Sequence, residues 1–213
     1  MTGVLGAIAE HGVVPVVAVD DADQARRLLE ALLRAGLPLA EITLRTQAGL
    51  GAIRVLAQEY PEAVIGAGTV RTLAEAEQVI AAGASFVVSP GTYPELIETC
   101  GVHGTPVLPG VCTPTEVDAA VRAGATVVKL FPAEVAGGVA LLRALSGPFA
   151  DVRFVPTGGI DATNLGAYLA VPSVVACGGS WFVAPSLLRR AAFDEVESLA
   201  REAVTIAQQV RHG

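Results

Sequence analysis

The sequence contains almost no lysine. Lys129 is the only one, so the rest of the 14 Lys+Arg residues are arginines. Positive charge is also outweighed, because 21 Asp+Glu residues give a formal net charge of −7. A protein that binds nucleic acid needs a basic surface that replaces the counterions of the phosphates. We therefore expect no nucleic-acid partner.

Long apolar runs are also missing, although hydrophobic residues make up 52% of the chain and the mean hydropathy is +0.55. No window approaches the ~18 apolar residues of a membrane-spanning helix, and the longest runs, such as Val13–Val19, have the length of a strand. The N-terminus lacks the basic opening of a signal peptide. We expect no membrane partner and a cytoplasmic location.

Cysteine and histidine are scarce and scattered, with three residues of each type. Cys100, Cys112 and Cys177 show no CxxC spacing, and an odd number in a reducing compartment suggests free thiols. The histidines are spread from position 11 to position 212, and none stands with carboxylates at the spacing of metal ligands. We expect neither a metal site nor a cofactor.

What the chain does contain is a regular alternation of short apolar segments and amphipathic ones. Thr72 and Thr113 each open a capping box, and Gly36, Gly83 and Gly124 follow the expected ends of helices. With 23 glycines and only 5% aromatics, the composition suits parallel strands of small aliphatic residues joined by tight turns. The predicted strands are Val13–Val19, Ala40–Arg45, Val64–Thr69, Phe86–Pro90, Pro106–Val111, Val127–Pro132, Arg153–Thr157 and Val174–Gly178.

This pattern of strands separated by helices predicts an α/β fold, a (β/α)₈ TIM barrel with an N-terminal capping helix. We expect a single domain over residues 1–213, because no linker or low-complexity stretch divides the chain. Residues 185–211 are expected to form one closing helix. An open Rossmann-like sheet is the structural alternative, but Arg71 stands where the dinucleotide fingerprint that begins at Gly66 needs a third glycine.

The parity of polar residues places charged side chains inside such a barrel. Glu41, Thr43 and Arg45 share one face of their strand, and the apolar residues between them face the helices. Inward charges are costly unless they are paired or serve a site. A structural ion pair between Glu41 and Arg45 is one interpretation. The other is a catalytic pair, because barrel enzymes gather their catalytic residues at the carboxyl ends of strands.

Lys129 shares the inward face of its apolar segment with Val127 and Phe131. Desolvation disfavours an ammonium ion, so a buried lysine can act as a nucleophilic amine and form a Schiff base with a carbonyl compound. A lysine that extends its charge to water is the alternative, and arginine-biased codon usage would also explain why lysine is rare. An amine, the Arg45 guanidinium and the Glu41 carboxylate together suit an α-keto acid, whose carboxylate an arginine can bind.

Glycine pairs mark the ends of the last two predicted strands. One pair follows Thr157 and the other precedes Ser180. In barrels the backbone N–H groups of these two loops commonly bind phosphate, although tight turning alone also selects glycine. We therefore predict a phosphate-binding site formed by Gly158, Gly159, Gly178, Gly179 and Ser180.

The chain resembles the class I 2-keto-3-deoxy-6-phosphogluconate/4-hydroxy-2-oxoglutarate aldolase family, in short motifs that keep the family's order. The resemblance implies a homotrimeric barrel in which Lys129 forms the Schiff base and Glu41 is the acid/base. It also implies that Arg45 and Thr69 bind pyruvate. The matching segments are Glu41–Thr46 (EITLRT), Gly66–Val70 (GAGTV), Ser89–Gly91 (SPG), Lys129–Ala133 (KLFPA), Val155–Ile160 (VPTGGI) and Gly178–Trp181 (GGSW).

We also expect Pro90, Phe131 and Thr157 to contact the substrate. Cys112 departs from the family pattern, either as a buried structural thiol or as part of the mouth of the barrel. The expected reaction cleaves 2-dehydro-3-deoxy-6-phosphogluconate to pyruvate and glyceraldehyde 3-phosphate, with 4-hydroxy-2-oxoglutarate as a second candidate substrate. A phosphosugar isomerase and a non-catalytic barrel that binds a phosphorylated metabolite are the alternatives. The sequence leaves open which sugar-acid series is cleaved.

Overall fold

The structure is a computed structural model that describes residues 2–212, and it alternates strands with helices along the chain. The strands are β1 (Val13–Val17), β2 (Leu39–Thr43), β3 (Val64–Gly68), β4 (Phe86–Val88), β5 (Val107–Leu108), β6 (Gly110–Val111), β7 (Val127–Leu130), β8 (Arg153–Phe154) and β9 (Cys177–Gly179). The helices are α1 (Gly3–His11), α2 (Ala22–Arg34), α3 (Gly49–Glu59), α4 (Leu73–Ala81), α5 (Pro94–Val102), α6 (Pro114–Arg122), α7 (Gly138–Ser146), α8 (Leu165–Leu169), α9 (Pro185–Arg189) and α10 (Phe193–His212), with a 3₁₀ turn at Trp181–Val183.

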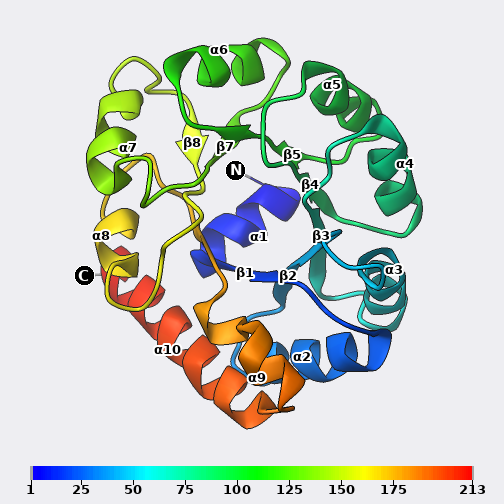
Figure 1. Cartoon of the computed structure of the whole chain (residues 1–213). Coiled ribbons are helices and arrows are strands. Elements are labelled where there is room, and N and C mark those ends of the chain that lie inside the picture. The colour runs from blue at the N-terminus through cyan, green and yellow to red at the C-terminus, as the bar shows by residue number, and fades with distance from the viewer. Residues whose placement is uncertain (1, 213) are drawn as a thin grey trace.

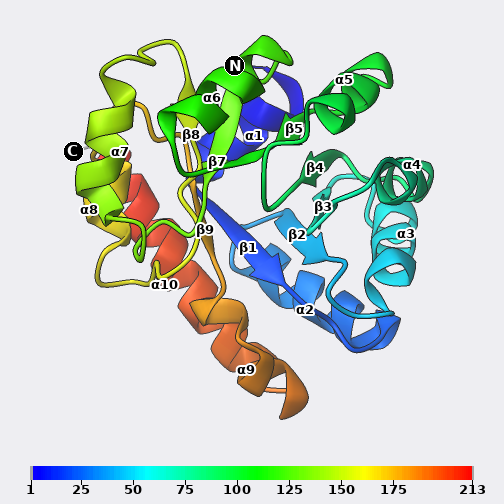
Figure 2. The same ribbon diagram turned by 45° about the horizontal axis from the view of Figure 1, so that its top comes forward.

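All the strands run parallel. Six of them form a sheet in the order β5-β4-β3-β2-β1-β9, and three form a second sheet in the order β6-β7-β8. The longest ladder joins β2 to β3, from Leu39↔Val64 to Thr43↔Gly68. Helices α2 to α8 and α10 surround the strands (Figures 1 and 2). The α/β class with a parallel sheet is therefore confirmed, and the carboxyl ends of the strands meet on one side of the molecule.

The helices begin where the sequence indicates. The side chains of Thr72 and Thr113 accept hydrogen bonds from the backbone N–H groups of Glu75 and Glu116, and both capping boxes are complete. The glycine that follows α2, Gly36, has the left-handed φ of 79°. Helix α2 then buries an apolar face that includes Leu28, Leu29 and Leu32.

Several boundaries differ from the prediction, and the strands are mostly shorter. The segment predicted as one strand over Pro106–Val111 is two strands, because Pro109 between them has no N–H to donate to a ladder. The closing helix is interrupted between α9 and α10, where Ala191 takes a φ of 54°. Within residues 2–212, no helix combines the length and the apolar character that a membrane span requires.

The capping box of α6 gives a test of the fold. We expect Thr113→Ala to lower the free energy of unfolding by about 1 kcal/mol, because the backbone N–H of Glu116 loses its acceptor. The control is Thr115→Ala, since Thr115 is exposed in the first turn of the same helix. Urea unfolding followed by circular dichroism measures both variants. Equal stability of the two variants would contradict the capping role.

Candidate active site

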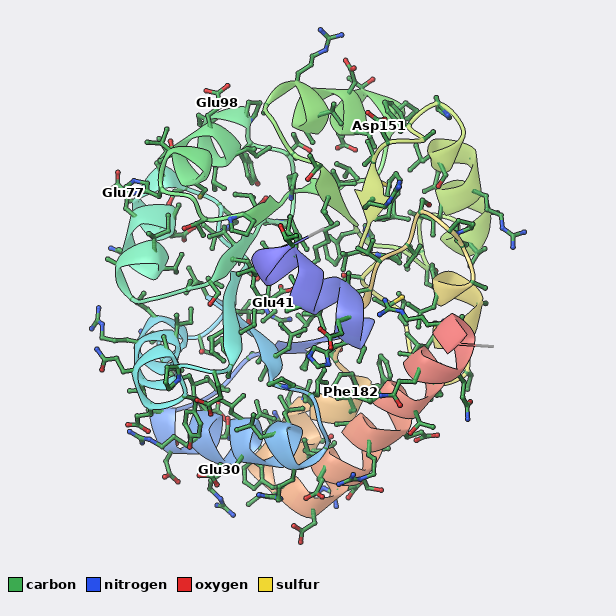
Figure 3. All side chains as sticks on the ribbon, turned by 180° about the vertical axis from the view of Figure 1, so that it is seen from behind. Glu30, Glu41, Glu77, Glu98, Asp151 and Phe182 are labelled. Atoms are coloured by element: carbon green, nitrogen blue, oxygen red, sulfur yellow. The ribbon has the colours of Figure 1, made fainter. Side chains whose placement is uncertain are left out.

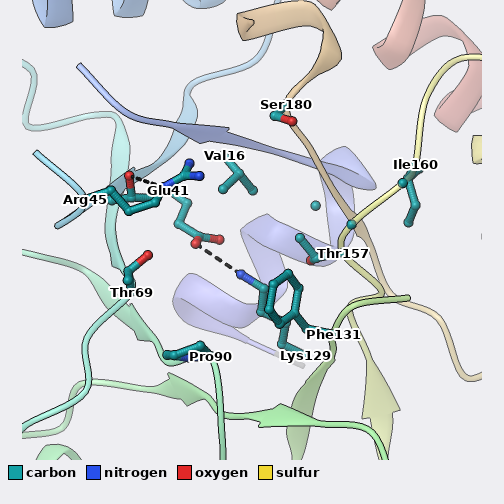
Figure 4. Close-up of a pocket in the computed structure, with 14 residues that line it drawn as sticks. Val16, Glu41, Arg45, Thr69, Pro90, Lys129, Phe131, Thr157, Ile160 and Ser180 are labelled. Carbon is teal, nitrogen blue, oxygen red and sulfur yellow. Dashed lines mark hydrogen bonds and ion pairs between the residues drawn. The ribbon is translucent and has the colours of Figure 1, made fainter. Parts of the chain in front are cut away.

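The carboxyl ends of the strands surround a pocket of about 270 Å³. It opens beside the ion pair between Lys129 and Glu41 (Figure 4). The residues that line it come from both sheets and from the loops that follow the strands. They are Val16, Glu41, Thr43, Arg45, Thr69, Pro90, Lys129, Phe131, Thr157, Gly158, Gly159, Ile160, Gly178 and Ser180.

The centre of the pocket is the contact between Lys129 of β7 and Glu41 of β2. The Lys129 Nζ lies 3.3 Å from the Glu41 Oε1, and the two residues are only 7% and 3% exposed. Figure 3 shows Glu41 inside the ring of strands, whereas other labelled carboxylates lie at the outer rim. The Nζ also lies 5.5 Å from the centre of the Phe131 ring. The lysine is therefore buried, and its charge does not extend to bulk water.

A glycine in the neighbouring strand makes room for this carboxylate. A Cβ at Gly68 would stand 2.3 Å from the Glu41 Oε1, far inside van der Waals contact. Any side chain at this position of β3 would displace the carboxylate from its present place beside Lys129.

Arg45 lies in the turn after β2, since the strand ends at Thr43, and its side chain is exposed. Its Nε donates a 3.1 Å hydrogen bond to the Thr43 Oγ1. The Glu41–Arg45 ion pair that we considered from the sequence is not formed, because the cation that contacts Glu41 is Lys129. Within residues 2–212, Arg45 takes part in no ion pair, so its guanidinium is available to an anion in the pocket.

Thr69, on the same side of the pocket as Arg45 (Figure 4), has a left-handed backbone with a φ of 65°. This conformation is rare for a β-branched residue and costs about 1–2 kcal/mol. Such strain persists where the surroundings fix it, and it is concentrated at functional sites.

The opposite side of the pocket is formed by Thr157, Ile160 and Ser180 (Figure 4) together with two glycines. Gly158 and Gly159 both have positive φ, 101° and 77°. Among residues 2–212, the N–H groups of Gly159 and Ile160 donate to no protein acceptor, although the loop lines the pocket. Free N–H groups in a glycine loop are suited to bind an anion.

The second glycine pair lies within strand β9, whereas the predicted strand ended at Gly178 and left Gly179 in the following loop. Its residues pair with β1, and each leaves space for a neighbouring side chain. A Cβ at Gly178 would stand 2.3 Å from the Thr157 Oγ1, and one at Gly179 would stand 2.0 Å from the Trp181 ring. Gly178 lines the pocket and Gly179 does not.

The structure thus gathers every predicted site residue except Gly179 around one pocket. Val16, Thr43 and Ile160 line it as well and were missing from the predicted site. Cys112 is half-buried outside it, and its backbone N–H donates to Glu116. Burial raises the pKa of the Cys177 thiol, which keeps that cysteine uncharged. Within residues 2–212, no group of three or more His, Cys, Asp or Glu residues could hold a metal ion.

A buried amine in contact with a carboxylate is typical of enzymes that form a Schiff base with a carbonyl substrate. The amine can add to a carbonyl carbon, and the carboxylate can move the protons that the addition and its reversal require. The unpaired guanidinium and the free N–H groups lie on either side of this pair, which suits a substrate that carries an anionic group at each end.

Comparison with known proteins agrees with this class. The family model of KDPG and KHG aldolase matches residues 5–199. The 2-dehydro-3-deoxy-phosphogluconate aldolase of Haemophilus influenzae is 45% identical over 202 residues, which are 93% of this chain and 94% of that protein. The chain belongs to the KDPG and KHG aldolase family.

Two solved structures are similar over almost the whole chain. The KDPG aldolase of Legionella pneumophila, with pyruvate captured as a covalent carbinolamine intermediate, has a TM-score of 0.91 and 36% identity and covers 95% of this chain and 98% of its own. The 2-keto-3-deoxy-6-phosphogluconate aldolase of Zymomonas mobilis, with 3-phosphoglycerate, has a TM-score of 0.88 and 36% identity and covers 95% of each chain.

The strained backbone of Thr69 predicts an inverted order of stability. We expect Thr69→Gly to be more stable than Thr69→Ala by about 1 kcal/mol, because only glycine adopts a left-handed φ without steric cost. The control is Thr99 in α5, where alanine should be about 1 kcal/mol more stable than glycine. Chemical denaturation measures the four variants. If alanine is the better residue at both positions, Thr69 is not left-handed in solution.

Proposed function

We propose that this protein is a class I aldolase that cleaves 2-dehydro-3-deoxy-6-phosphogluconate to pyruvate and glyceraldehyde 3-phosphate. The observation that carries the proposal is the 3.3 Å contact between the buried amine of Lys129 and the Glu41 carboxylate, in a pocket of a chain that belongs to this family. 4-Hydroxy-2-oxoglutarate, which would give pyruvate and glyoxylate, is a second substrate of the same site.

Lys129 begins the reaction as the nucleophile. In its neutral form the Nζ adds to the keto carbon C2, and loss of water from the carbinolamine gives an iminium ion. The iminium ion accepts the electron pair of the C3–C4 bond when that bond breaks, so the pyruvyl part becomes an enamine on Lys129. Protonation of C3 and hydrolysis of the imine then release pyruvate and restore the amine.

Glu41 is the group that moves the protons. Its carboxylate lies beside the Nζ and is therefore close to C3 and C4 of a substrate that is bound to the Nζ through C2. It accepts the proton of the C4 hydroxyl as the C3–C4 bond breaks, and the glyceraldehyde 3-phosphate leaves as an aldehyde. The resulting carboxylic acid then protonates C3 of the enamine, so one residue is base and acid in turn.

The two ends of the substrate are assigned to the two sides of the pocket. Arg45 and Thr69 bind the carboxylate next to C2. Gly158, Gly159, Gly178 and Ser180 surround the phosphate on C6, although Gly179, predicted with them, stands outside the pocket. Pro90 and Phe131 form the wall between the two ends, and Thr157 contacts the substrate on the side of the glycine loop. Remote binding of this kind places the bond to be broken against Lys129.

The molecules held by two relatives support the proposed substrate. Pyruvate is covalently captured in the Legionella pneumophila enzyme, and 3-phosphoglycerate, which has the three-carbon phosphorylated skeleton of the expected aldehyde product, is present in the Zymomonas mobilis enzyme. A phosphosugar isomerase or a barrel that only binds a metabolite would use the glycine loops but would have no need of an amine held against a carboxylate.

We infer that the two sheets are parts of one closed (β/α)₈ barrel in a single domain over residues 1–213. Support comes from the bridges Phe154↔Val174 and Thr157↔Gly178, which link the region of β8 to that of β9, and from the single residue that separates β5 from β6. Helix α1 lies over the centre of the ring of strands in Figure 3, as a capping helix would. The homotrimer and the cytoplasmic location remain predictions, and light scattering would test the former.

The proposed Schiff base can be trapped. Pyruvate with sodium borohydride should add one reduced pyruvyl group to the protein, and peptide mapping should place it on Lys129, the only lysine of the chain. Lys129→Arg keeps the positive charge but cannot become a neutral amine, so it is the control that should remain unlabelled and inactive. Labelling that persists in this variant, beyond the N-terminal amine, would overturn the mechanism.

Removal of the Glu41 charge tests the proton transfer. We expect Glu41→Gln to fold and to bind pyruvate but to lose turnover by roughly 10²- to 10⁴-fold, the range for a general acid or base. Glu62→Gln is the control, because Glu62 is exposed in the turn before β3. Steady-state cleavage rates for both variants decide the matter, and wild-type turnover in Glu41→Gln would leave Glu41 a structural partner of Lys129.

A further inference from the structure

The loop of Gly158 and Gly159 is tied to the outer layer of the protein through both of its carbonyl groups. The Glu134 N–H donates to the Gly158 carbonyl at 3.0 Å, and the Asn164 Nδ2 donates to the Gly159 carbonyl at 2.9 Å. In a planar trans peptide, the carbonyl and the N–H of the next residue point in opposite directions. With both carbonyls turned outward, the N–H groups of Gly159 and Ile160 are turned away from the outer layer, toward the pocket that these residues line.

The side-chain amide of Asn164 makes two hydrogen bonds to the backbone of this loop. While its Nδ2 binds the Gly159 carbonyl, its Oδ1 accepts a 2.9 Å hydrogen bond from the Asp161 N–H. One side-chain amide thus spans Ile160, the residue between. Asn164 precedes α8, yet its side chain does not cap that helix. Its polar atoms are used for the loop.

Glu134 fixes the loop from the other side through packing. A Cβ at Gly159 would stand 2.5 Å from the Glu134 Cβ, so the side chain lies directly against the glycine. The Glu134 carboxylate accepts a 2.6 Å hydrogen bond from the hydroxyl of Tyr168, a residue of α8 that is 1% exposed. Burial, together with the charge of Glu134, raises the pKa of Tyr168, so the phenol keeps its proton and remains a donor.

This hydrogen bond matters because Glu134 is an anion beside a site for anions. Unpaired N–H groups of a glycine loop attract any nearby carboxylate as they attract a phosphate. Tyr168 engages the Glu134 carboxylate, and the other acid near the loop, Asp161, accepts hydrogen bonds from Thr163. Neither carboxylate is then free to occupy the N–H groups.

We propose that Asn164 and the Tyr168–Glu134 pair are positioning residues for the substrate's phosphate group. Asn164 fixes the direction of the N–H groups, and Tyr168 keeps the Glu134 carboxylate from competing for them. The inference rests on the proposed function, since it assigns these N–H groups to phosphate.

Replacement of Asn164 tests the first part. We expect Asn164→Ala to raise the KM for 2-dehydro-3-deoxy-6-phosphogluconate roughly tenfold, with kcat nearly unchanged. This is the effect of losing about one hydrogen bond between the loop and the phosphate. Deuterium exchange into the methyl group of pyruvate, which needs the imine but no phosphate, should keep the wild-type rate. The control is Gln24→Ala, which removes another side-chain amide that binds a backbone N–H, at the start of α2. An equal loss in cleavage and in exchange would mean that Asn164 serves only the fold.

A double-mutant cycle tests the second part. Tyr168→Phe removes only the hydroxyl group and should raise the same KM several-fold, because the Glu134 carboxylate is released toward the loop. Adding Glu134→Gln removes the competing charge and should restore most of the affinity, a coupling that only neighbouring residues show. If the double variant is as weak as Tyr168→Phe or weaker, competition by Glu134 is ruled out.

The inference can fail separately from the proposed function. If wild-type protein shows neither pyruvate exchange nor cleavage, the aldolase proposal fails. Inorganic phosphate, titrated against backbone amide signals in NMR spectra of wild-type and Asn164→Ala protein, then still decides the role of the loop. Weaker binding in the variant, with shifts confined to Gly158–Ile160 and Ser180 in the wild type, supports the inference. Equal binding in the two proteins overturns it.

Discussion

The site depends on keeping two opposite charges in contact among parallel, mostly apolar strands. Removing Lys129 and Glu41 from water costs several kcal/mol for each ion, and a buried ion pair is often less stable than apolar residues of the same volume. A protein that needed only a stable core would gain by replacing both. Their contact at 3.3 Å, at the base of a pocket open to small molecules, is therefore better explained by chemistry than by stability.

The glycines of the strands make this arrangement sterically feasible. Gly68 leaves room for the Glu41 carboxylate, Gly178 leaves room for Thr157, and Gly110 allows the backbone of Pro90 to come within a distance that a Cβ would forbid. Glycine weakens a strand because it adds no packing and loses more conformational entropy on folding. At these three positions, that cost accompanies the close approach of site residues, so these glycines serve the space between the strands rather than a turn.

The alternation of polar and apolar residues along a strand was the main indicator of which side chains point inward. It succeeded where a strand contains both kinds of residue and failed where it does not. In β2 and β7 polar residues interrupt apolar ones, so parity placed Glu41, Thr43 and Lys129 inside. Val16 belongs to β1, whose residues are all apolar (Val13–Val17), so alternation gave no indication of its inward direction. The left-handed backbone of Thr69 has no sequence signal, because threonine disfavours that conformation. Gly179 was misplaced outside the strand because a glycine pair resembles a turn, whereas its neighbour Trp181 is the reason for the glycine.

In the proposed orientation of the substrate, the two ends of the pocket bind anions by different physical means. At one end, the Arg45 guanidinium carries a full charge on a long side chain, which can adjust to a carboxylate. At the other end, the lining residues that we assign to the phosphate offer only neutral groups, such as the N–H groups of Gly159 and Ile160 and the Ser180 hydroxyl. The attraction of a dipole depends on its orientation, and that of a charge does not. A site that uses dipoles needs a fixed backbone, which explains why both carbonyls of the glycine loop are tied down while Arg45 has a single hydrogen bond to Thr43.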